Sequence, residues 1–243
     1  QGALGDAQAV RRPRREGELA AVTIELEVPG DERAASRRAA ELIAAAGASA
    51  ARERGSFAFA MSGGRSPWAM LAILGELEEM PWDRTELFQV DERVAAPGDQ
   101  ARNLTHMVLG LSMEHQPALR PMPVTQRDLL GAAREYEATL PERLDLVHLG
   151  LGPDGHTASL VPNDPVLEVD DRRVAMTGGS YQGHRRMTLT YPALAAARRI
   201  VWLVAGADKR EALQKLLAGD ESIPAGRVRN EEMVVVADEA AAA

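Results

Sequence analysis

The chain has 243 residues, of which 45% are apolar and 26% are charged, and these proportions are typical of a globular protein with one substantial core. Its net charge of −8 argues against a nucleic-acid-binding surface, and the absence of cysteine excludes disulfides, thiolate metal sites and a catalytic thiol. The longest strongly apolar stretch, residues 200–207, is too short to span a membrane, and the N-terminal residues lack the apolar core of a signal peptide. We therefore expect a cytoplasmic protein with no membrane partner and no nucleic-acid partner.

Residues 1–19 are predicted to be a flexible tail, with an Arg-rich run at 11–15, and residues 20–243 are predicted to form a single domain. In chain order, strands are expected at 20–28, 56–62, 86–91, 145–152, 174–177, 186–190, 199–205 and 233–237. Helices are expected at 31–53, from Pro67 onward, at 103–113, 127–140 and 208–218, with 120–124 as a connector or edge segment. This alternation predicts an α/β fold whose mainly parallel sheet is covered on both faces.

Ligands of such sheets bind at the carboxyl ends of the strands, and the polar motifs of this chain lie at those ends. The first motif is Ser62-Gly63-Gly64-Arg65-Ser66-Pro67, between a buried strand and a helix. Its glycines allow backbone N–H groups to converge on an anion at the helix N-terminus, although a tight turn without a ligand explains them equally well. The motif is neither a Walker loop nor a dinucleotide fingerprint.

The second motif is Asp91-Glu92-Arg93, at the end of another buried strand. Arg93 is a candidate for binding substrate oxygens, and Asp91 for accepting a hydroxyl or anchoring the loop. A solvated loop is the simpler interpretation of three consecutive charges. Asn103, further along this loop, is either part of the site or a helix N-cap.

The third motif spans residues 150–160 and places Asp154 and His156 two residues apart in a glycine-rich turn. A neutral imidazole can take a proton from water, and such general-base catalysis contributes roughly 10²–10⁴-fold in rate. Asp154 is expected to orient His156 or to hold a sugar hydroxyl. His148, inside the preceding strand, is expected to be a core residue. The histidines show no zinc-like spacing, so we expect no metal.

The fourth motif, Gly206-Ala207-Asp208-Lys209-Arg210, places two positive charges in the first turn of a helix, where they oppose the helix dipole. A bound phosphate explains that placement, and a surface lysine whose ammonium group extends into solvent is the alternative. Only two of the 28 basic residues are lysines, and the other, Lys215, lies four residues after Glu211 in a surface-type pair. Together the four motifs predict attack of water on an activated carbonyl of a phosphorylated small molecule. We expect backbone N–H groups near Gly152 or Gly155 to stabilise the oxyanion that forms.

These motifs, in this order, resemble the 6-phosphogluconolactonase family. The resemblance also includes Arg-Met-Thr-Leu-Thr at 186–190 and covers about residues 22–241. It implies a three-layer α/β/α sandwich, modified from the Rossmann fold and related to glucosamine-6-phosphate deaminase and ribose-5-phosphate isomerase. It implies hydrolysis of 6-phospho-D-glucono-1,5-lactone to 6-phosphogluconate in the oxidative pentose phosphate pathway, without a cofactor, by a monomer or small homo-oligomer.

By the same resemblance, His156 is the base that activates water, with Asp154 beside it. The expected substrate- and phosphate-binding residues are Ser62, Gly63, Gly64, Arg65, Arg93, Lys209 and Arg186. A glucosamine-6-phosphate deaminase is the first alternative, but those enzymes typically continue after the histidine with Ile-Ala-Phe-Asn-Glu-Pro, where this chain has 157–162 as Thr-Ala-Ser-Leu-Val-Pro. The second alternative is a non-catalytic sugar-phosphate-sensing domain, which would lack the base.

Overall fold

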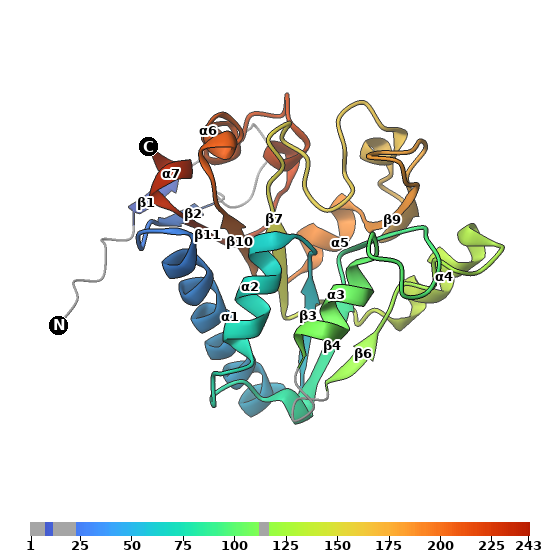
Figure 1. The fold of residues 1–243 in the computed structure, drawn as a ribbon, viewed down its shortest axis with the longest axis horizontal. Coiled ribbons are helices and arrows are strands. Elements are labelled where there is room, and N and C mark those ends of the chain that lie inside the picture. The colour runs from blue at the N-terminus through green and yellow to red at the C-terminus, as the bar shows by residue number, and fades with distance from the viewer. Residues whose placement is uncertain (1–7, 12–22, 112–116) are drawn as a thin grey trace.

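The computed structural model describes residues 8–11, 23–111 and 117–243 (Figure 1). Residues Gln8–Arg11, within the segment expected to be a tail, form strand β1, which pairs antiparallel with β2 (Thr23–Glu27). The rest of the expected tail, including 12–15 of the Arg-rich run, lies outside the described residues. The sequence did not predict the β1 strand.

The main sheet has eight strands in the order β1-β2-β11-β10-β7-β3-β4-β6, and every pair except β1–β2 is parallel. The remaining strands of this sheet are β3 (Phe57–Met61), β4 (Thr85–Gln89), β6 (Ala118–Arg120), β7 (Leu146–Gly150), β10 (Ile200–Val204) and β11 (Glu232–Ala237). The expected α/β fold with a mainly parallel sheet is confirmed. The edge strand β6 overlaps the expected connector or edge segment, 120–124, only at Arg120.

Helices cover both faces of this sheet, because its central strands are apolar on both sides. In β10, Val201 and Leu203 pack into one buried cluster, whereas Trp202 and Val204 pack into the other. The first cluster is covered by α1 (Glu32–Arg54), α2 (Arg65–Leu74) and α3 (Asn103–Gly110), which lie on the near side of the sheet in Figure 1. The second is covered by α4 (Leu129–Thr139), α5 (Tyr191–Ala196) and α6 (Arg210–Ala218).

Short elements complete the chain. Single 3₁₀ turns occur at η1 (Trp82–Arg84), η2 (Pro165–Glu168), η3 (Ala207–Lys209) and η4 (Pro224–Arg227), and α7 (Glu239–Ala242) ends the described chain. Helix α1 begins where its sequence predicts, because the side chain of Asp31 accepts the N–H of Ala34 at 2.8 Å. It ends at Gly55, whose φ of 84° is a left-handed conformation that suits glycine.

A second, antiparallel sheet has the order β5-β9-β8, from β5 (Asp91–Arg93), β9 (Arg186–Leu189) and β8 (Val174–Met176). The sequence did not predict it, and the expected strand at 86–91 is two strands. The chain changes sheets at Val90, whose N–H bonds to Met61 of the main sheet at 3.1 Å while its carbonyl accepts the N–H of Leu189 at 2.8 Å. Asp91 consequently pairs with Thr188 and leaves the main sheet.

The strand order reverses between β3 and β7. From β3 the chain builds outward through β4 and β6, and from β7 it builds in the opposite direction through β10 and β11. Loops that leave the carboxyl ends of two such strands diverge to opposite faces of the sheet and leave a crevice between them. The motifs at 62–67 and 150–160 are those two loops, so the fold brings them together.

Candidate active site

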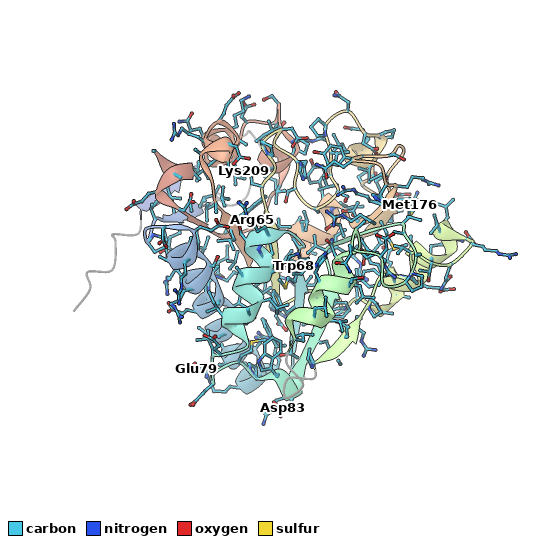
Figure 2. All side chains as sticks on the ribbon, viewed as in Figure 1. Arg65, Trp68, Glu79, Asp83, Met176 and Lys209 are labelled. Carbon is cyan, nitrogen blue, oxygen red and sulfur yellow. The ribbon has the colours of Figure 1, made fainter. Side chains whose placement is uncertain are left out.

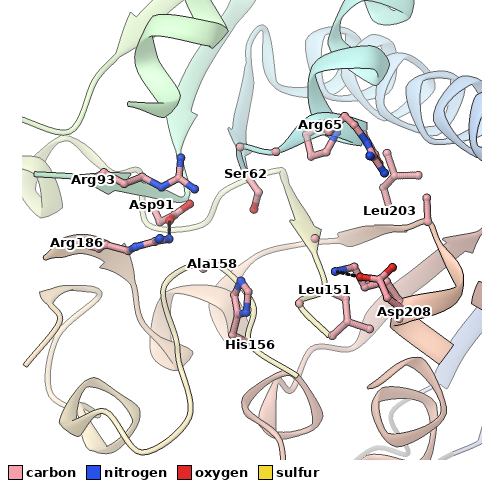
Figure 3. Close-up of a pocket in the computed structure, with 18 residues that line it drawn as sticks. Ser62, Arg65, Asp91, Arg93, Leu151, His156, Ala158, Arg186, Leu203 and Asp208 are labelled. Carbon is pink, nitrogen blue, oxygen red and sulfur yellow. Dashed lines mark ion pairs between the residues drawn. The ribbon is translucent and has the colours of Figure 1, made fainter. Parts of the chain in front are cut away.

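A pocket of about 260 Å³ opens at the carboxyl ends of β3, β7 and β10 (Figure 3). Its lining includes every predicted binding residue and the predicted base, namely Ser62, Gly63, Gly64, Arg65, Arg93, His156, Arg186 and Lys209. In Figure 2, Lys209 and Arg65 lie above the middle of the view, whereas Glu79 and Asp83 lie at its lower end. Asp154 is not part of the lining, but its carboxylate contacts His156, which is.

His156 is held by one of its two ring nitrogens. Nδ1 lies 2.5 Å from Oδ1 of Asp154 and 3.2 Å from the hydroxyl oxygen of Tyr181. An ionised carboxylate only accepts hydrogen bonds, so this contact places the imidazole proton on Nδ1. No described residue is a hydrogen-bond partner of Nε2, and the ring projects into the pocket in Figure 3. Nε2 therefore has its lone pair free on the pocket side.

The surroundings of this pair favour an ionised Asp154. Partial burial by itself would raise the pKa of Asp154, but hydrogen bonds from His156 and Tyr181 bring it below its usual value. The phenol of Tyr181 donates to Oδ2 of Asp154 at 2.9 Å, and burial together with the neighbouring carboxylate raises the pKa of Tyr181 to about 12. Tyr181 therefore stays protonated and acts as the donor at neutral pH.

The glycines of the 150–160 turn allow the backbone to approach the imidazole closely. A Cβ added to Gly152 would lie 2.0 Å from Nδ1 of His156, so only glycine fits beneath the ring. Gly155 has a φ of +80°, and a Cβ there would lie 2.4 Å from the side chain of Ile223. The N–H of Ala225 also donates to the carbonyl of Gly155 at 2.9 Å. The contacts of Ile223 and Ala225 with Gly155 therefore support the turn.

The sequence suggested N–H groups near Gly152 or Gly155 as oxyanion donors, and this interpretation is wrong. Gly152 donates its N–H to the carbonyl of His156 at 2.8 Å, and Gly155 donates to the carbonyl of Gly152 at 3.0 Å. Both donors are used to close the turn itself. Neither can serve a ligand without opening the turn.

Free backbone donors occur instead in the loop at 62–67. Gly64 has a φ of 134°, in the region that favours glycine, and precedes the first turn of α2. No acceptor among the described residues takes the N–H groups of Gly63, Gly64 and Arg65. These three N–H groups at the start of a ten-residue helix are available to an anion.

The serine hydroxyls of that loop have other partners. Ser62 donates to the carbonyl of His148 at 3.0 Å, and Ser66 donates to Glu32 at 2.7 Å. The side chain of Arg65 is 84% exposed, and its ion pair with Glu32 is long at 3.7 Å. Its guanidinium is thus available to a ligand, whereas the hydroxyl protons are not.

Lys209 completes this side of the pocket. Its side chain is 21% exposed, and Nζ lies 3.0 Å from the carboxylate of the more exposed Asp208. Lys215 is paired with Glu211 at 2.7 Å on the surface of α6, as its spacing predicted. Asp208 has no second cation within ion-pair distance among the described residues, so a more strongly charged anion can compete with it for Lys209.

Two arginines line the opposite side of the pocket, which Figure 3 shows beyond Ser62 and His156. Arg93 donates from Nη1 to Asn103 Oδ1 at 2.8 Å, and Arg186 lies 3.8 Å from Asp91. Burial lowers the pKa of Arg186, although this group remains charged at neutral pH. Nε of each arginine is buried without a hydrogen-bond partner.

Asp91 is the centre of the network behind these arginines. Its carboxylate accepts the hydroxyl of Ser159 at 2.6 Å and the amide of Asn103 at 3.1 Å. The sequence offered an N-cap as one role for Asn103, and that role is wrong, because Arg102 precedes α3 and Asn103 directs its side chain to Asp91 and Arg93. The interpretation of Asp91-Glu92-Arg93 as a solvated loop is also wrong, since Asp91 and Glu92 are buried.

Glu92 was assigned no role from the sequence. Strand geometry turns it away from the pocket, between Asp91 and Arg93, which line it. Its carboxylate accepts the N–H groups of Asn103 at 2.7 Å and Leu104 at 2.9 Å. Glu92 therefore caps α3 and fixes the segment that carries Asn103.

Tyr181 and Ser159 were also missed. Tyr181 lies in a glycine-rich segment, Gly178-Gly179-Ser180-Tyr181-Gln182-Gly183, which signals a turn but gives no sign of what the tyrosine contacts. Ser159 lies within the 150–160 motif, where its position after His156 was the available signal. In residues 8–11, 23–111 and 117–243 no group of three or more His, Cys, Asp or Glu side chains is arranged to hold a metal ion. No helix of these segments is both long and apolar enough to cross a membrane.

The chain is a mainly parallel α/β sandwich with a cationic pocket and an Asp–His pair at the reversal of strand order, which is where proteins of this class bind their ligands. Comparison with known proteins identifies the family. The profile described as glucosamine-6-phosphate isomerases/6-phosphogluconolactonase matches residues 30–236. The chain belongs to this family.

Two curated relatives support the lactonase branch. The 6-phosphogluconolactonase of a Nostoc species is 34% identical over 206 residues, which cover 79% of this chain and 85% of the relative. The 6-phosphogluconolactonase of a Synechocystis species is 36% identical over 179 residues, which cover 68% and 73%. The expected resemblance to 6-phosphogluconolactonases is therefore confirmed.

Solved structures agree with this assignment. The 6-phosphogluconolactonase of Thermotoga maritima superimposes with a TM-score of 0.78 at 26% identity, over 88% of this chain and 99% of that one. A monomeric glucosamine-6-phosphate deaminase reaches a TM-score of 0.78 at 20% identity over 89% of this chain, and this likeness shows the shared fold.

Proposed function

We propose that this chain hydrolyses 6-phospho-D-glucono-1,5-lactone to 6-phosphogluconate, with His156 as the general base. The names of the curated relatives support this substrate, and the contacts of His156 support its role as the general base. Asp154 holds Nδ1 at 2.5 Å, which leaves Nε2 to take a proton from a water in the pocket. We further propose that residues 20–243 act as one domain in the cytoplasm, without a cofactor, as a monomer or small homo-oligomer.

The hydrolytic step is a simple ester hydrolysis. Nε2 of His156 takes a proton from water as the water oxygen attacks C1 of the lactone. A tetrahedral oxyanion forms on the carbonyl oxygen. Its collapse breaks the bond between C1 and the ring oxygen, and the imidazolium returns its proton to that oxygen. The product is an open-chain carboxylic acid, which ionises at neutral pH.

The two cationic sides of the pocket have different roles in this proposal. The free N–H groups of Gly63 and Gly64, with Arg65 and Lys209, hold the phosphate, because they combine a helix N-terminus with two positive charges. Arg93 and Arg186, on the other side of His156, hold sugar oxygens and stabilise the oxyanion. Ser62 lines the floor between these two sides.

The activity is tested by generating the lactone with glucose-6-phosphate dehydrogenase and following 6-phosphogluconate through its own dehydrogenase. A blank at slightly acidic pH records spontaneous hydrolysis. We expect the protein to accelerate the reaction over this blank, and the His156→Ala variant to lose about 10²–10⁴-fold in kcat with little change in KM. His184→Ala, outside the pocket lining, is the control.

Failure of the well-folded protein to accelerate hydrolysis would refute the proposal. Release of ammonia from glucosamine 6-phosphate would then indicate the deaminase activity instead. Binding of the sugar phosphate without either reaction would indicate a sensing domain. Full activity in His156→Ala would keep the substrate but remove the base from the mechanism.

A further inference from the structure

Tyr181 lies at one end of a tight turn that joins β8 to β9. Its N–H donates to the carbonyl of His184 at 2.9 Å, and the N–H of His184 returns to the carbonyl of Tyr181 at 3.3 Å. The two residues between them, Gln182 and Gly183, have φ values of 51° and 85°. Such two-residue turns match the twist of a hairpin and hold its ends in register. The backbone therefore fixes the position of Tyr181.

The side of the hairpin that carries Tyr181 is anchored to the loop that follows the 150–160 turn. The carboxylate of Asp164 accepts the N–H of Gly178 at 2.9 Å and the N–H of Gly179 at 3.1 Å. The segment that carries Tyr181 and the segment that carries His156 are thus joined by hydrogen bonds as well as by the chain. These hydrogen bonds therefore restrict movement of Tyr181 relative to His156.

The hydroxyl of Tyr181 reaches the Asp154–His156 pair directly. It donates to Oδ2 of Asp154 at 2.9 Å, and its oxygen lies 3.2 Å from Nδ1 of His156. The phenol ring meets the imidazole edge to face, with ring centroids 5.2 Å apart. Both carboxylate oxygens of Asp154 are therefore engaged, one by the imidazole and one by the phenol, and the carboxylate cannot rotate without losing a hydrogen bond.

The ring of Tyr181 also supports a cation of the pocket. Cζ of Arg186 lies 5.0 Å from the centroid of the phenol ring, and Nη2 of Arg186 donates to the carbonyl of Tyr181 at 3.2 Å. Arg186 is 3% exposed in its side chain and lines the pocket. One tyrosine therefore contacts the proposed base through its hydroxyl and a binding arginine through its ring.

We propose that Tyr181 is a positioning residue with two separable roles. Its hydroxyl holds Asp154 so that His156 keeps its proton on Nδ1 and presents Nε2 to the substrate. Its ring holds the guanidinium of Arg186 against the pocket. The kinetic part of this inference depends on the proposed lactonase function, whereas the effect on the imidazole does not.

Two variants separate the roles. Tyr181→Phe removes the hydroxyl and keeps the ring, so kcat falls about tenfold while KM stays within about twofold of the wild type. Tyr181→Leu removes both, so KM also rises, by about tenfold, because Arg186 loses its support. A side chain with only a structural role would instead change both constants together, or neither, in the two variants.

Tyr191→Phe is a matched control. The hydroxyl of Tyr191 donates to the carbonyl of Pro224 at 2.9 Å, and Cζ of Arg227 lies 5.0 Å from its ring. It thus makes the same kinds of contact as Tyr181, but it is not part of the pocket lining. We expect its kcat and KM to equal those of the wild type.

A spectroscopic measurement tests the inference independently of activity. ¹⁵N NMR of the imidazole of His156, above its titration range, reports which nitrogen carries the proton. We expect one tautomer, protonated on Nδ1, in the wild type and in Tyr191→Phe, and a mixture of tautomers in Tyr181→Phe. An unchanged tautomer and an unchanged kcat in Tyr181→Phe would overturn the inference. A changed tautomer in a protein without lactonase activity would support the positioning role and refute the proposed function.

Discussion

The closeness of Gly152 to the imidazole predicts a large catalytic effect from one added methyl group. In Gly152→Ala, the new Cβ would lie 2.0 Å from Nδ1 and 2.2 Å from Cε1 of His156. To reach an ordinary contact of 3.4 Å, the ring has to retreat by about 1.4 Å. Since a misplacement of about 1 Å costs on the order of 10²-fold in rate, we expect kcat to fall about 100-fold. KM should change little, because the cations of the pocket are not displaced.

The assay is the coupled lactone assay, combined with thermal unfolding to measure stability. Overpacking costs about 1–3 kcal/mol, so the melting temperature should fall by about 2–12 °C while the protein stays folded at 25 °C. Gly179→Ala is the matched control, because its added Cβ would meet only Asp164, at 3.9 Å. A folded Gly152→Ala variant with a kcat within threefold of the wild type would refute the position assigned to the base.

Two further predictions concern Lys209 and His148. Lys209→Ala should raise KM for the phosphorylated lactone about 10–100-fold, because a charge-assisted hydrogen bond is lost. Lys215 is paired with Glu211 on the surface, so Lys215→Ala should leave KM unchanged. Steady-state kinetics of both variants would test this prediction. Burial lowers the pKa of His148 to about 3, so the unfolded chain takes up a proton between about pH 6.5 and pH 3 that the folded protein does not. The free energy of unfolding should therefore fall by up to about 1.4 kcal/mol per pH unit as pH is lowered through this range. Urea denaturation of His148→Leu should show this contribution removed. If the free energies of unfolding of the two proteins changed with pH in parallel, this account would be contradicted.

The alternation of strands and helices was predictable, because burial of both faces leaves a continuous apolar pattern in strands such as β10. The second sheet was not. Val90 bonds to Met61 on one side and to Leu189 on the other, and the second of these partners is about one hundred residues away. No local pattern distinguishes such a residue from the interior of a single strand.

The parts of the candidate site that lie within one sequence motif were predictable, whereas the parts that depend on contacts between distant residues were not. Asp154 and His156 are two residues apart, so their pairing could be expected from the sequence. Tyr181 reaches the same carboxylate from 27 residues away, at 2.9 Å, by means of a turn that the sequence signals only through its glycines. The direction of the N–H groups at Gly152 and Gly155 depends on backbone angles that a glycine leaves open, and this is why the oxyanion interpretation failed.

The support beneath Gly155 has a consequence for protein engineering. Ile223 fills the space below this glycine, and Ala225 bonds to its carbonyl, so the height of His156 in the pocket depends on a segment almost seventy residues further along the chain. A graft of the Asp-Gly-His turn alone onto another scaffold would lack these supporting contacts. The transferable unit is the turn together with residues 220–227. A design that copies only the motif would reproduce its sequence without the position of its histidine.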